Sequence, residues 1–140
     1  MTTGSGFTGP AAGGRMPPRA ALLGLDWGTT TLRGFLMGEG GVVLAERSAK
    51  AGILNIQNGA FAEGLLDLAG DWLEAEGDLP IVASGMIGSR QGWAEAPYVD
   101  IPAAAGDLTL YRHDGFERPI HIIPGLARRD GDGVPDVMRG

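Results

Sequence analysis

The chain has 140 residues, of which 44% are hydrophobic, so it is long enough for one domain with a buried core. Its formal net charge is −6 and its arginines form no basic stripe, which argues against nucleic acid as a partner. The absence of cysteine excludes disulfides and thiolate metal sites. No apolar run approaches the roughly 18 to 20 residues that span a bilayer, so no membrane partner is expected and a cytoplasmic location is compatible with the composition.

Residues 1–18 are rich in Gly, Pro, Thr, Ser and Ala and carry a single charge, on Arg15. They lack the apolar stretch of a secretory signal peptide. We therefore predict a disordered tail over 1–18 and a folded domain over 19–140. Met16 stands just before the first expected strand and is an alternative start of the protein.

The segment 22–37, with the sequence LLGLDWGTTTLRGFLM, is typical of two strands joined by a tight turn. A short apolar run ends at Asp26, and apolar and other residues alternate again over 32–37. The turn between them consists of a glycine and three threonines, namely Gly28, Thr29, Thr30 and Thr31.

This turn is rich in groups that bind phosphate. Gly28 lets the backbone bend close to a ligand, and backbone amides and threonine hydroxyls are donors suited to phosphate oxygens. Asp26 is a hard oxygen ligand of the kind that Mg²⁺ prefers, and Arg33 adds a fixed positive charge. The alternative is a plain β-hairpin in which Asp26 accepts hydrogen bonds within the turn.

After this hairpin, the sequence predicts a third strand over 42–46 and a loop over 48–55 with its bend at Gly52. Asn58 is a candidate N-cap for a helix over about 59–75. The three strands are close in sequence and have short turns, so they are expected to form an antiparallel meander.

Apolar residues recur at helical spacing along one face of the predicted helix, and acidic residues lie on the other face, where we expect them to be solvated. The apolar face comprises Phe61, Leu65, Leu66, Leu68, Ala69, Trp72 and Leu73, and the acidic face Glu63, Asp67, Asp71 and Glu74. A buried strand over 79–84 is then expected beside the first strand and parallel to it, with the helix as the crossover. The predicted fold class is α/β, with a mixed sheet in which an antiparallel three-strand meander is followed by a helix and a parallel strand.

A glycine-rich segment follows that strand and comprises Ser84, Gly85, Met86, Ile87, Gly88 and Ser89. Open α/β sheets bind ligands outside the carboxyl ends of their strands, where Asp26 also lies. The glycines allow close approach of a ligand and the serines supply hydroxyls, although the glycines can also serve only the geometry of a turn. Trp93 and Tyr98 are candidates for stacking on a sugar-like ligand, or for covering an edge of the core.

Further short strands are predicted over 98–101, 108–111 and 119–123, the last of these being the final strong strand. The residues 128–136 are polar and glycine-rich and are expected to form a loop. The chain then stops at Gly140 with neither a helix cap nor a closing strand, so it looks cut.

Three segments resemble the 2-dehydro-3-deoxygalactonokinase family in their order and spacing. They are LDWGTTTLRGFLM, VASGMIGSRQGWAEAPYVDIPA and IHIIPGLARRDGDGVPDVMRG. The first also resembles the phosphate motif of the actin-like ATPase superfamily, whereas the second and third point to the kinase family itself. The resemblance covers about residues 20–140 and corresponds to the N-terminal half of such an enzyme.

The resemblance implies an actin-like (ribonuclease H-like) domain, one of two that close over a cleft. It implies transfer of the ATP γ-phosphoryl group to the 6-hydroxyl of 2-dehydro-3-deoxy-D-galactonate, with Mg²⁺, in galactonate catabolism. By this likeness Asp26 would hold Mg²⁺, the turn 28–31 and Arg33 would face the nucleotide phosphates, and 84–89 with Trp93 would face the sugar acid. A homodimer is compatible with this interpretation.

The family's C-terminal half, which holds most of the adenosine pocket, has no counterpart in these 140 residues, and no general base is identified in them. We therefore expect this chain alone to be catalytically silent and to bind ATP with millimolar or weaker affinity. One alternative is a truncated, non-catalytic sugar- or nucleotide-binding module of the same fold. A second is a phosphatase with Asp26 as nucleophile, but such enzymes usually need another acid two residues on, where this chain has Gly28.

Overall fold

The computed structural model describes residues 19–97, 99–100, 110–129 and 135–138. The predicted tail, Tyr98 and the residues 101–109 lie outside the described residues, so the strands expected over 98–101 and 108–111 are described only in part.

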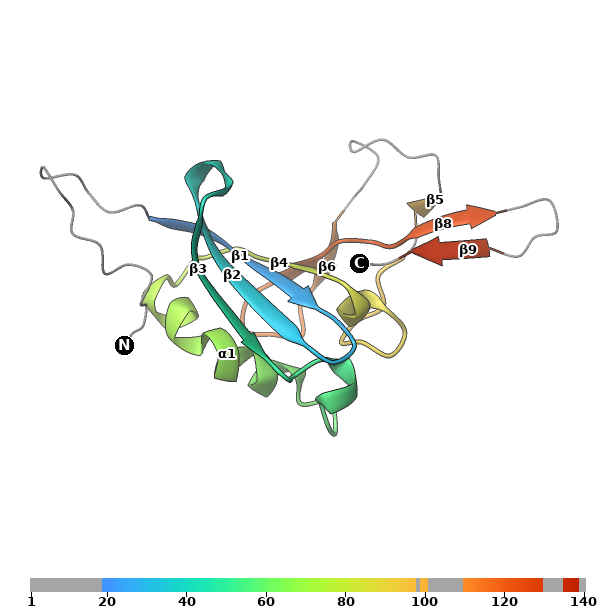
Figure 1. The fold of residues 1–140 in the computed structure, drawn as a ribbon, viewed down its shortest axis with the longest axis horizontal. Helices are drawn as coiled ribbons and strands as arrows, with labels where there is room; N and C mark the ends of the chain where they lie inside the picture. Colours follow the sequence, from blue (N-terminus) through green and yellow to red (C-terminus); the bar gives the residue numbers. More distant parts are fainter. Residues whose placement is uncertain (1–18, 98, 101–109, 130–134, 139–140) are drawn as a thin grey trace, which may run out of the picture.

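The described chain forms two sheets and one helix (Figure 1). The strands are β1 (Ala20–Trp27), β2 (Leu32–Gly38), β3 (Val43–Ala49), β4 (Ile81–Ser84), β5 (Val99–Asp100), β6 (Tyr111–His113), β7 (Ile120–Ile122), β8 (Leu126–Arg129) and β9 (Pro135–Met138). The helix is α1 (Phe61–Ala75), and three short 3-10 turns are η3 (Glu39–Gly41), η4 (Ile53–Asn55) and η5 (Met86–Gly88).

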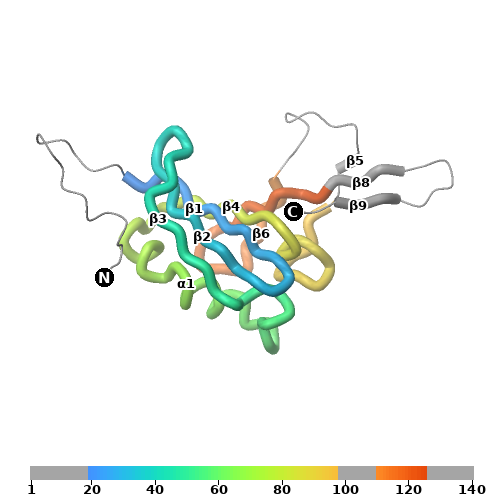
Figure 2. Tube along the Cα trace, in the orientation of Figure 1, coloured from blue at the N-terminus to red at the C-terminus, as the bar shows by residue number. Residues whose placement is uncertain are grey.

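The larger sheet has six strands in the order β3-β2-β1-β4-β7-β6. The first three strands pair antiparallel, β4 lies parallel to β1, and β7 lies parallel to β4. These pairings confirm the predicted meander followed by a helix and a parallel strand. Figure 2 traces this path, with β1 and β4 side by side in the middle of the sheet. The smaller sheet has the order β5-β8-β9.

The hydrophobic core lies between the six-stranded sheet and α1. Because side chains alternate along a strand, every second residue of β1 and β2 faces the helix, which is the alternation seen in the sequence. The buried sheet residues include Leu23, Leu25, Trp27, Leu32, Leu36, Ile81, Ala83, Ile120 and Ile122, and the buried helix residues are Leu65, Leu68, Ala69, Trp72 and Leu73.

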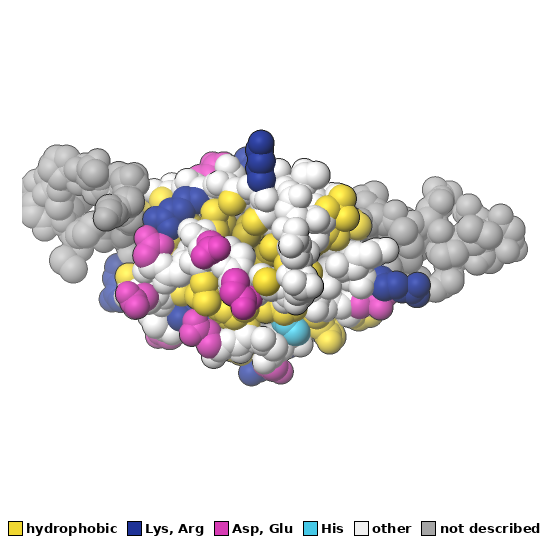
Figure 3. All heavy atoms as spheres, turned by 90° about the horizontal axis from the view of Figure 1, so that it is seen from below, with side chains coloured by type: hydrophobic (Ala, Val, Ile, Leu, Met, Phe, Trp, Pro, Cys, Tyr) yellow, Lys and Arg dark blue, Asp and Glu magenta, His cyan; other side chains and the backbone are white. Residues whose placement is uncertain are grey.

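A small residue on β2 lets the helix approach the sheet. A Cβ placed on Gly34 would lie 3.0 Å from Cδ2 of Leu68 and 3.6 Å from the Trp72 ring. The opposite face of α1 carries the exposed acids predicted from the sequence, and Figure 3, which views the molecule from below Figure 1, shows carboxylates gathered over this region. Solvation rather than packing therefore accounts for the acidic half of the helix sequence.

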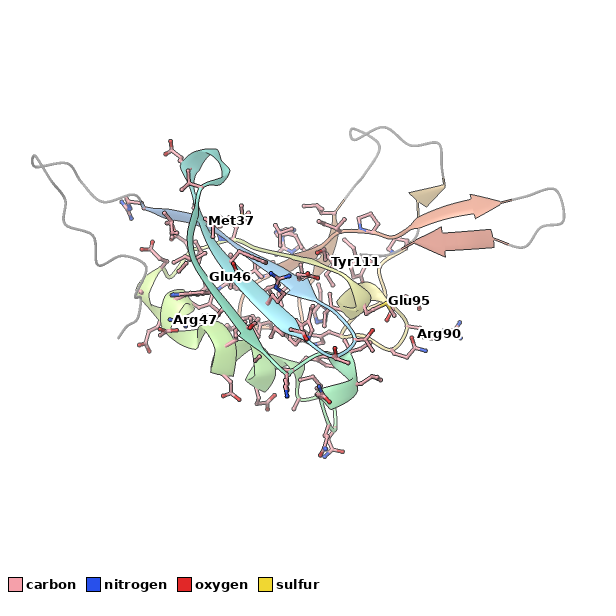
Figure 4. The ribbon with its side chains drawn as sticks, in the orientation of Figure 1. Met37, Glu46, Arg47, Arg90, Glu95 and Tyr111 are labelled. Atoms are coloured by element: carbon pink, nitrogen blue, oxygen red, sulfur yellow. The ribbon has the colours of Figure 1, made fainter. Side chains whose placement is uncertain are left out.

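Arg47 ties the edge strand β3 to α1. Its guanidinium donates two hydrogen bonds to the carboxylate of Asp71, at 2.6 and 2.9 Å, and a third to the carbonyl oxygen of Leu68. It also lies 4.0 Å from the centre of the Trp72 ring, a cation–π contact. In Figure 4 the Arg47 side chain is directed toward α1.

Arg118, in the connection before β7, holds the C-terminal end of α1. Its guanidinium donates to the carbonyl oxygens of Leu73, Glu76 and Leu79 at 3.0 to 3.2 Å. The last carbonyls of a helix have no partner within the helix and carry partial negative charge, so a cation there both satisfies and neutralises them. The helix end is thereby fixed to the β6–β7 side of the sheet.

The predicted start of the helix is wrong. The helix begins at Phe61, its N-cap is Ala60, and no side chain caps it. Asn58 instead has φ of 56°, and Gly59 follows with φ of 72°, so both residues form a left-handed turn before the helix. Asn tolerates that conformation, which is the physical reason that it occurs here without capping. Leu66 is also 42% exposed and does not belong to the apolar face.

Two further expectations differ from the structure. Strand β3 runs to Ala49, so the first residues of the expected 48–55 loop are paired with β2. Leu126–Arg129 and Pro135–Met138 pair as antiparallel strands where the sequence predicted a polar loop. Polar residues can form strands when their backbone groups are paired, so the polar composition of 128–136 did not by itself indicate a loop. Among the described residues, no helix is both long and apolar enough to cross a membrane.

Candidate functional site

The site is built where parallel strands end. Strands β1, β4 and β7 run in the same direction, so the segments that follow Trp27, Ser84 and Ile122 leave the sheet at one edge. The three segments that carried the sequence resemblance therefore meet at this edge, which is where open α/β sheets bind ligands.

Asp26 lies between two polar neighbours at this edge. It is opposite Arg33 on β2 and opposite Ser84 on β4 in the strand register. Asp26 and Arg33 are exposed and Ser84 is half-buried, with its hydroxyl 3.4 Å from the carbonyl oxygen of Leu25. The sheet thus presents a carboxylate to solvent between a cation and a hydroxyl.

Gly85 brings the glycine-rich segment directly against β1. Its φ is +99°, and a Cβ placed on it would lie 2.7 Å from the carbonyl oxygen of Trp27 and 3.5 Å from Oδ1 of Asp26. A side chain here would be strained by the dihedral angle and would collide with the backbone. Glycine is therefore required for the first and second motifs to meet.

The carbonyl groups of the turn 28–31, which we call the phosphate turn, all accept hydrogen bonds. The donors are the N–H of Ile53 for Gly28 (3.0 Å), Leu54 for Thr29 (3.0 Å), Gly52 for Thr30 (3.1 Å) and Gly28 for Thr31 (2.9 Å). The side-chain amide of Asn55 donates a second bond to Thr30, also at 3.1 Å. The segment 52–55 therefore lies behind the turn and satisfies three of its four carbonyl acceptors.

Three of the four N–H groups of the same turn are left available. Those of Thr29, Thr30 and Thr31 find no acceptor among the residues that the structure describes. Thr29 and Thr30 are exposed and Thr31 is half-buried. With all its carbonyls occupied and three of its amides free, the turn presents hydrogen-bond donors, and neighbouring backbone donors favour an anion.

Asp26 fits a magnesium ion held together with a phosphorylated ligand. Mg²⁺ is usually bound by one or two carboxylates and completes its shell with waters and phosphate oxygens. An exposed carboxylate beside a donor-rich turn meets that requirement. Over the described ranges, no group of three or more His, Asp or Glu residues forms a dedicated metal cage.

Arg33 makes contacts other than the predicted phosphate contact. Its guanidinium is 3.1 Å from Oε2 of Glu46 and lies 5.4 Å from the centre of the Phe35 ring. Both side chains of this ion pair are about half exposed, so the pair contributes little to the free energy of folding. Arg33 can therefore exchange Glu46 for another anion at little cost. Arg33 remains on the same sheet face as Asp26, within its neighbouring strand.

The glycine-rich segment folds into η5, and its side chains are divided between core and surface. Ile87 is fully buried, and its carbonyl oxygen accepts hydrogen bonds from the N–H groups of Trp93 and Ala94. The hydroxyl of Ser89 donates to the carbonyl oxygen of Met86 at 2.6 Å, and Gly88 is buried. A Cβ on Gly92 would lie 2.1 Å from the carbonyl oxygen of Ile87, which shows how closely the following loop folds back.

Trp93 lies in an aromatic cluster beneath this loop. Its ring stacks on Phe61 (5.8 Å between centroids, 14° between planes) and meets Trp27, His113 and Phe116 edge-on at 5.1 to 5.9 Å. This placement matches the alternative in which the aromatic residue covers an edge of the core. Tyr98, the other stacking candidate, lies outside the described residues.

His113 packs edge-on against Trp93 in this cluster. Burial lowers the pKa of His113, and the nearby carboxylate of Asp114 opposes that shift only in part. Nε2 of the imidazole is buried and has no hydrogen-bond partner among the described residues, and a Cβ on Gly115 would lie 2.7 Å from it. The imidazole therefore acts here as an aromatic packing group.

Sequence analysis did not identify Gly52 or Asn55 as part of the site. Gly52 was seen only as a bend, yet a Cβ on it would lie 2.3 to 2.4 Å from backbone atoms of Thr29 and Thr30. The signal that could have identified them is the presence of a glycine, Gly52, and an amide residue, Asn55, in the loop that follows the antiparallel meander. Such a loop necessarily returns toward the turn between the first two strands.

Known proteins similar to this chain share one description. A family model described as 2-keto-3-deoxy-galactonokinase matches residues 26–140. The Rhizobium meliloti (strain 1021) protein named probable 2-dehydro-3-deoxygalactonokinase DgoK1 is 42% identical over 118 residues, which cover 83% of this chain and 38% of that protein. The Escherichia coli (strain K12) 2-dehydro-3-deoxygalactonokinase is 35% identical over 121 residues, which cover 86% of this chain and 40% of that protein.

A solved structure is similar as well. The crystal structure of a Sinorhizobium meliloti protein provisionally named a 2-dehydro-3-deoxygalactonokinase superposes with a TM-score of 0.65 and 41% identity, over 85% of this chain and 40% of that one. The chain thus spans about two fifths of the length of the relatives that it matches.

Proposed function

The chain belongs to the 2-keto-3-deoxy-galactonokinase family, and from this membership we propose that it supplies the phosphate-binding side of a carbohydrate kinase active site. The proposed reaction transfers the γ-phosphoryl group of ATP to the 6-hydroxyl of 2-dehydro-3-deoxy-D-galactonate. The proposed fold is one actin-like, ribonuclease H-like domain of a two-domain enzyme that works in the cytoplasm.

The observation that carries this proposal is the hydrogen bonding of the phosphate turn. Every carbonyl of residues 28–31 accepts a hydrogen bond, whereas the three threonine N–H groups have no acceptor among the described residues. Phosphoryl transfer asks a protein mainly for positioning and for neutralisation of charge, and preorganised backbone donors supply both.

We assign roles to the residues at this edge of the sheet. The amides and hydroxyls of Thr29, Thr30 and Thr31 bind the terminal phosphates, and Gly28 gives the turn its close approach. Asp26 holds Mg²⁺, which when bound neutralises charge on the β- and γ-phosphates. Arg33, once released from Glu46, offsets the charge on the transferred group.

The sugar acid is proposed to bind beside Asp26 along the segment 84–89. Gly85 and Ser84 border Asp26 directly, so a hydroxyl placed there would be close to a phosphate held by the turn. Half-buried Met86 continues this side of the site, whereas Ile87, Gly88 and Ser89 are buried and support it. Half-buried Trp93 follows this segment and packs against the rings of Trp27 and Phe61.

A kinase assay on the full-length protein tests the proposal. MgATP and 2-dehydro-3-deoxy-D-galactonate should give ADP and a phosphorylated sugar acid, and ATP without the sugar acid should give no comparable turnover. Absence of phosphorylation across keto-deoxy sugar acids, with the protein folded, would favour the alternative of a non-catalytic sugar- or nucleotide-binding module. For the 140-residue chain alone, isothermal titration should give a millimolar or weaker Kd for MgATP, because a few hydrogen bonds barely offset the cost of association.

A further inference from the structure

We propose that Asn55 is a positioning residue of the phosphate turn, and that the segment 52–55 determines in which direction the turn's amides point. This inference rests on the proposed function, because it concerns how the same turn binds phosphate. It concerns residues that touch the turn from behind and make no contact with the ligand themselves.

The argument begins with the geometry of the peptide bond. In a trans peptide, the carbonyl of one residue and the N–H of the next lie in one plane and point in opposite directions. The carbonyls of Gly28, Thr29 and Thr30 are held toward the segment 52–55. The N–H groups of the three threonines must therefore point away from that segment, toward the exposed side of the turn.

Each anchoring bond therefore orients one amide. The bond from Ile53 to Gly28 orients the N–H of Thr29, and the bond from Leu54 to Thr29 orients the N–H of Thr30. Thr30 differs because its carbonyl accepts two bonds, from the N–H of Gly52 and from the side chain of Asn55, both at 3.1 Å. These two bonds together orient the N–H of Thr31.

Asn55 supplies the side-chain part of this arrangement. A carbonyl oxygen has two lone pairs, and with both occupied the Thr30 carbonyl has no remaining acceptor capacity to turn toward solvent. If the Asn55 bond is lost, the Thr30–Thr31 peptide is held by one bond at the exposed tip of the turn. Rotation of that peptide would turn the N–H of Thr31 away from the exposed side of the turn and bring the carbonyl oxygen of Thr30 there, and that oxygen repels phosphate.

Gly52 makes the arrangement possible sterically. A Cβ on this residue would lie 2.3 Å from the carbonyl carbon of Thr30 and 2.4 Å from that of Thr29. The backbone of segment 52–55 can approach the turn closely enough for four hydrogen bonds only because position 52 has no side chain.

The test compares Asn55→Ala with a matched control in the full-length protein. Gln57→Ala removes an exposed amide side chain of the same loop that makes no hydrogen bond within the described residues. Asn55→Ala should lower kcat/KM for MgATP roughly two- to tenfold, the range of one hydrogen bond, and leave KM for the sugar acid unchanged. Asn55→Asp, which has the same shape but cannot donate, should be at least as impaired. Asn55→Gln, which keeps the donor, should recover part of the loss.

A second readout does not depend on turnover. Amide hydrogen exchange should be several-fold faster at Gly28 and at the donors Gly52, Ile53 and Leu54 in Asn55→Ala than in Gln57→Ala, because the anchored turn opens more often. Unchanged exchange at these amides would overturn the inference, as would equal losses of kcat/KM in the two variants. If the unmodified protein shows no kinase turnover, the proposed function fails, and the exchange comparison still decides whether Asn55 holds the turn.

Discussion

Gly85 lies so close to Trp27 that a Cβ on the glycine would be 2.7 Å from the tryptophan carbonyl oxygen. This contact joins the strand that ends in Asp26 to the segment that follows β4. Gly85→Ala should lower the free energy of unfolding by about 1–3 kcal/mol, because φ of +99° is strained for alanine and the backbones must separate. It should also reduce turnover by displacing Asp26 from the segment 84–89.

Urea unfolding of this variant against Gly77→Ala gives the measurement. Gly77 has no heavy atom within 4 Å of a Cβ placed on it, so that substitution should leave stability unchanged or raise it by up to about 1 kcal/mol. Equal stability of the two variants would contradict the close contact between the two motifs.

Asp26→Ala should abolish MgATP-dependent turnover of the full-length protein while the fold is retained. Asp26 is exposed at the end of β1, so its removal costs no packing, and its proposed role is to hold Mg²⁺. Steady-state kinetics would be compared with Asp67→Ala, which removes an exposed acid from the outer face of α1 and should be fully active. Retention of more than about a tenth of the rate, equivalent to only about 1.4 kcal/mol, would remove Asp26 from the metal site.

Arg33→Lys should lower kcat roughly tenfold at saturating MgATP, about 1.4 kcal/mol in the barrier, because a planar two-donor group becomes a point charge. The matched variant is Glu46→Gln, which removes the carboxylate that Arg33 contacts and should retain the rate. Identical, near-normal kinetics for both variants would mean that Arg33 serves only its ion pair with Glu46.

The pairing of Arg47 with Asp71 should appear in the pH dependence of stability. Hydrogen bonds from Arg47 hold the pKa of Asp71 below its ordinary value of 3.8, against a smaller opposing effect of burial. A lowered folded-state pKa stabilises the fold above pH 3.8, and that contribution is lost as the pH falls through the folded-state pKa. Asp71→Asn should therefore be less stable by up to about 1 kcal/mol at neutral pH, with the difference shrinking below pH 3.8.

Denaturant unfolding from pH 7 down to the acid transition measures this difference. Asp67→Asn provides the reference, since Asp67 is exposed on the same helix and makes no ion pair within the described chain. A difference between Asp71→Asn and the unmodified protein that stays constant across the acid range would show that the lost stability comes from packing instead.

The parts of the fold that were predictable from sequence are those with a simple period. Alternation over 32–37 predicted β2 and its buried face, and helical spacing of apolar residues predicted α1. The parallel placement of β4 beside β1 followed from the chain order and the handedness of crossovers. The position of Asp26 at the strand end followed from the same reasoning.

The missed features depend on backbone conformation and on contacts distant in sequence. Asn58 is a residue type that often caps helices, but here it has a positive φ, as does Gly59 after it. The helix therefore begins later, with Ala60 as its N-cap. The donors behind the phosphate turn are mostly main-chain N–H groups, which every residue except proline has, so no residue type marks them. Arg33 was assigned by its charge and spacing, whereas its contact with Glu46 arises from the pairing of β2 with β3.

Trp27 also provides an optical signal for this site without any label. Its indole is fully buried, it stands between Asp26 and Gly28 in the sequence, and its N–H donates to the carbonyl oxygen of Ala51 at 2.7 Å. Indole fluorescence responds to the local electric field and to that hydrogen bond. A multiply charged ligand bound at the neighbouring turn would change this field, so the proposed nucleotide binding can be tested by the emission of the native protein.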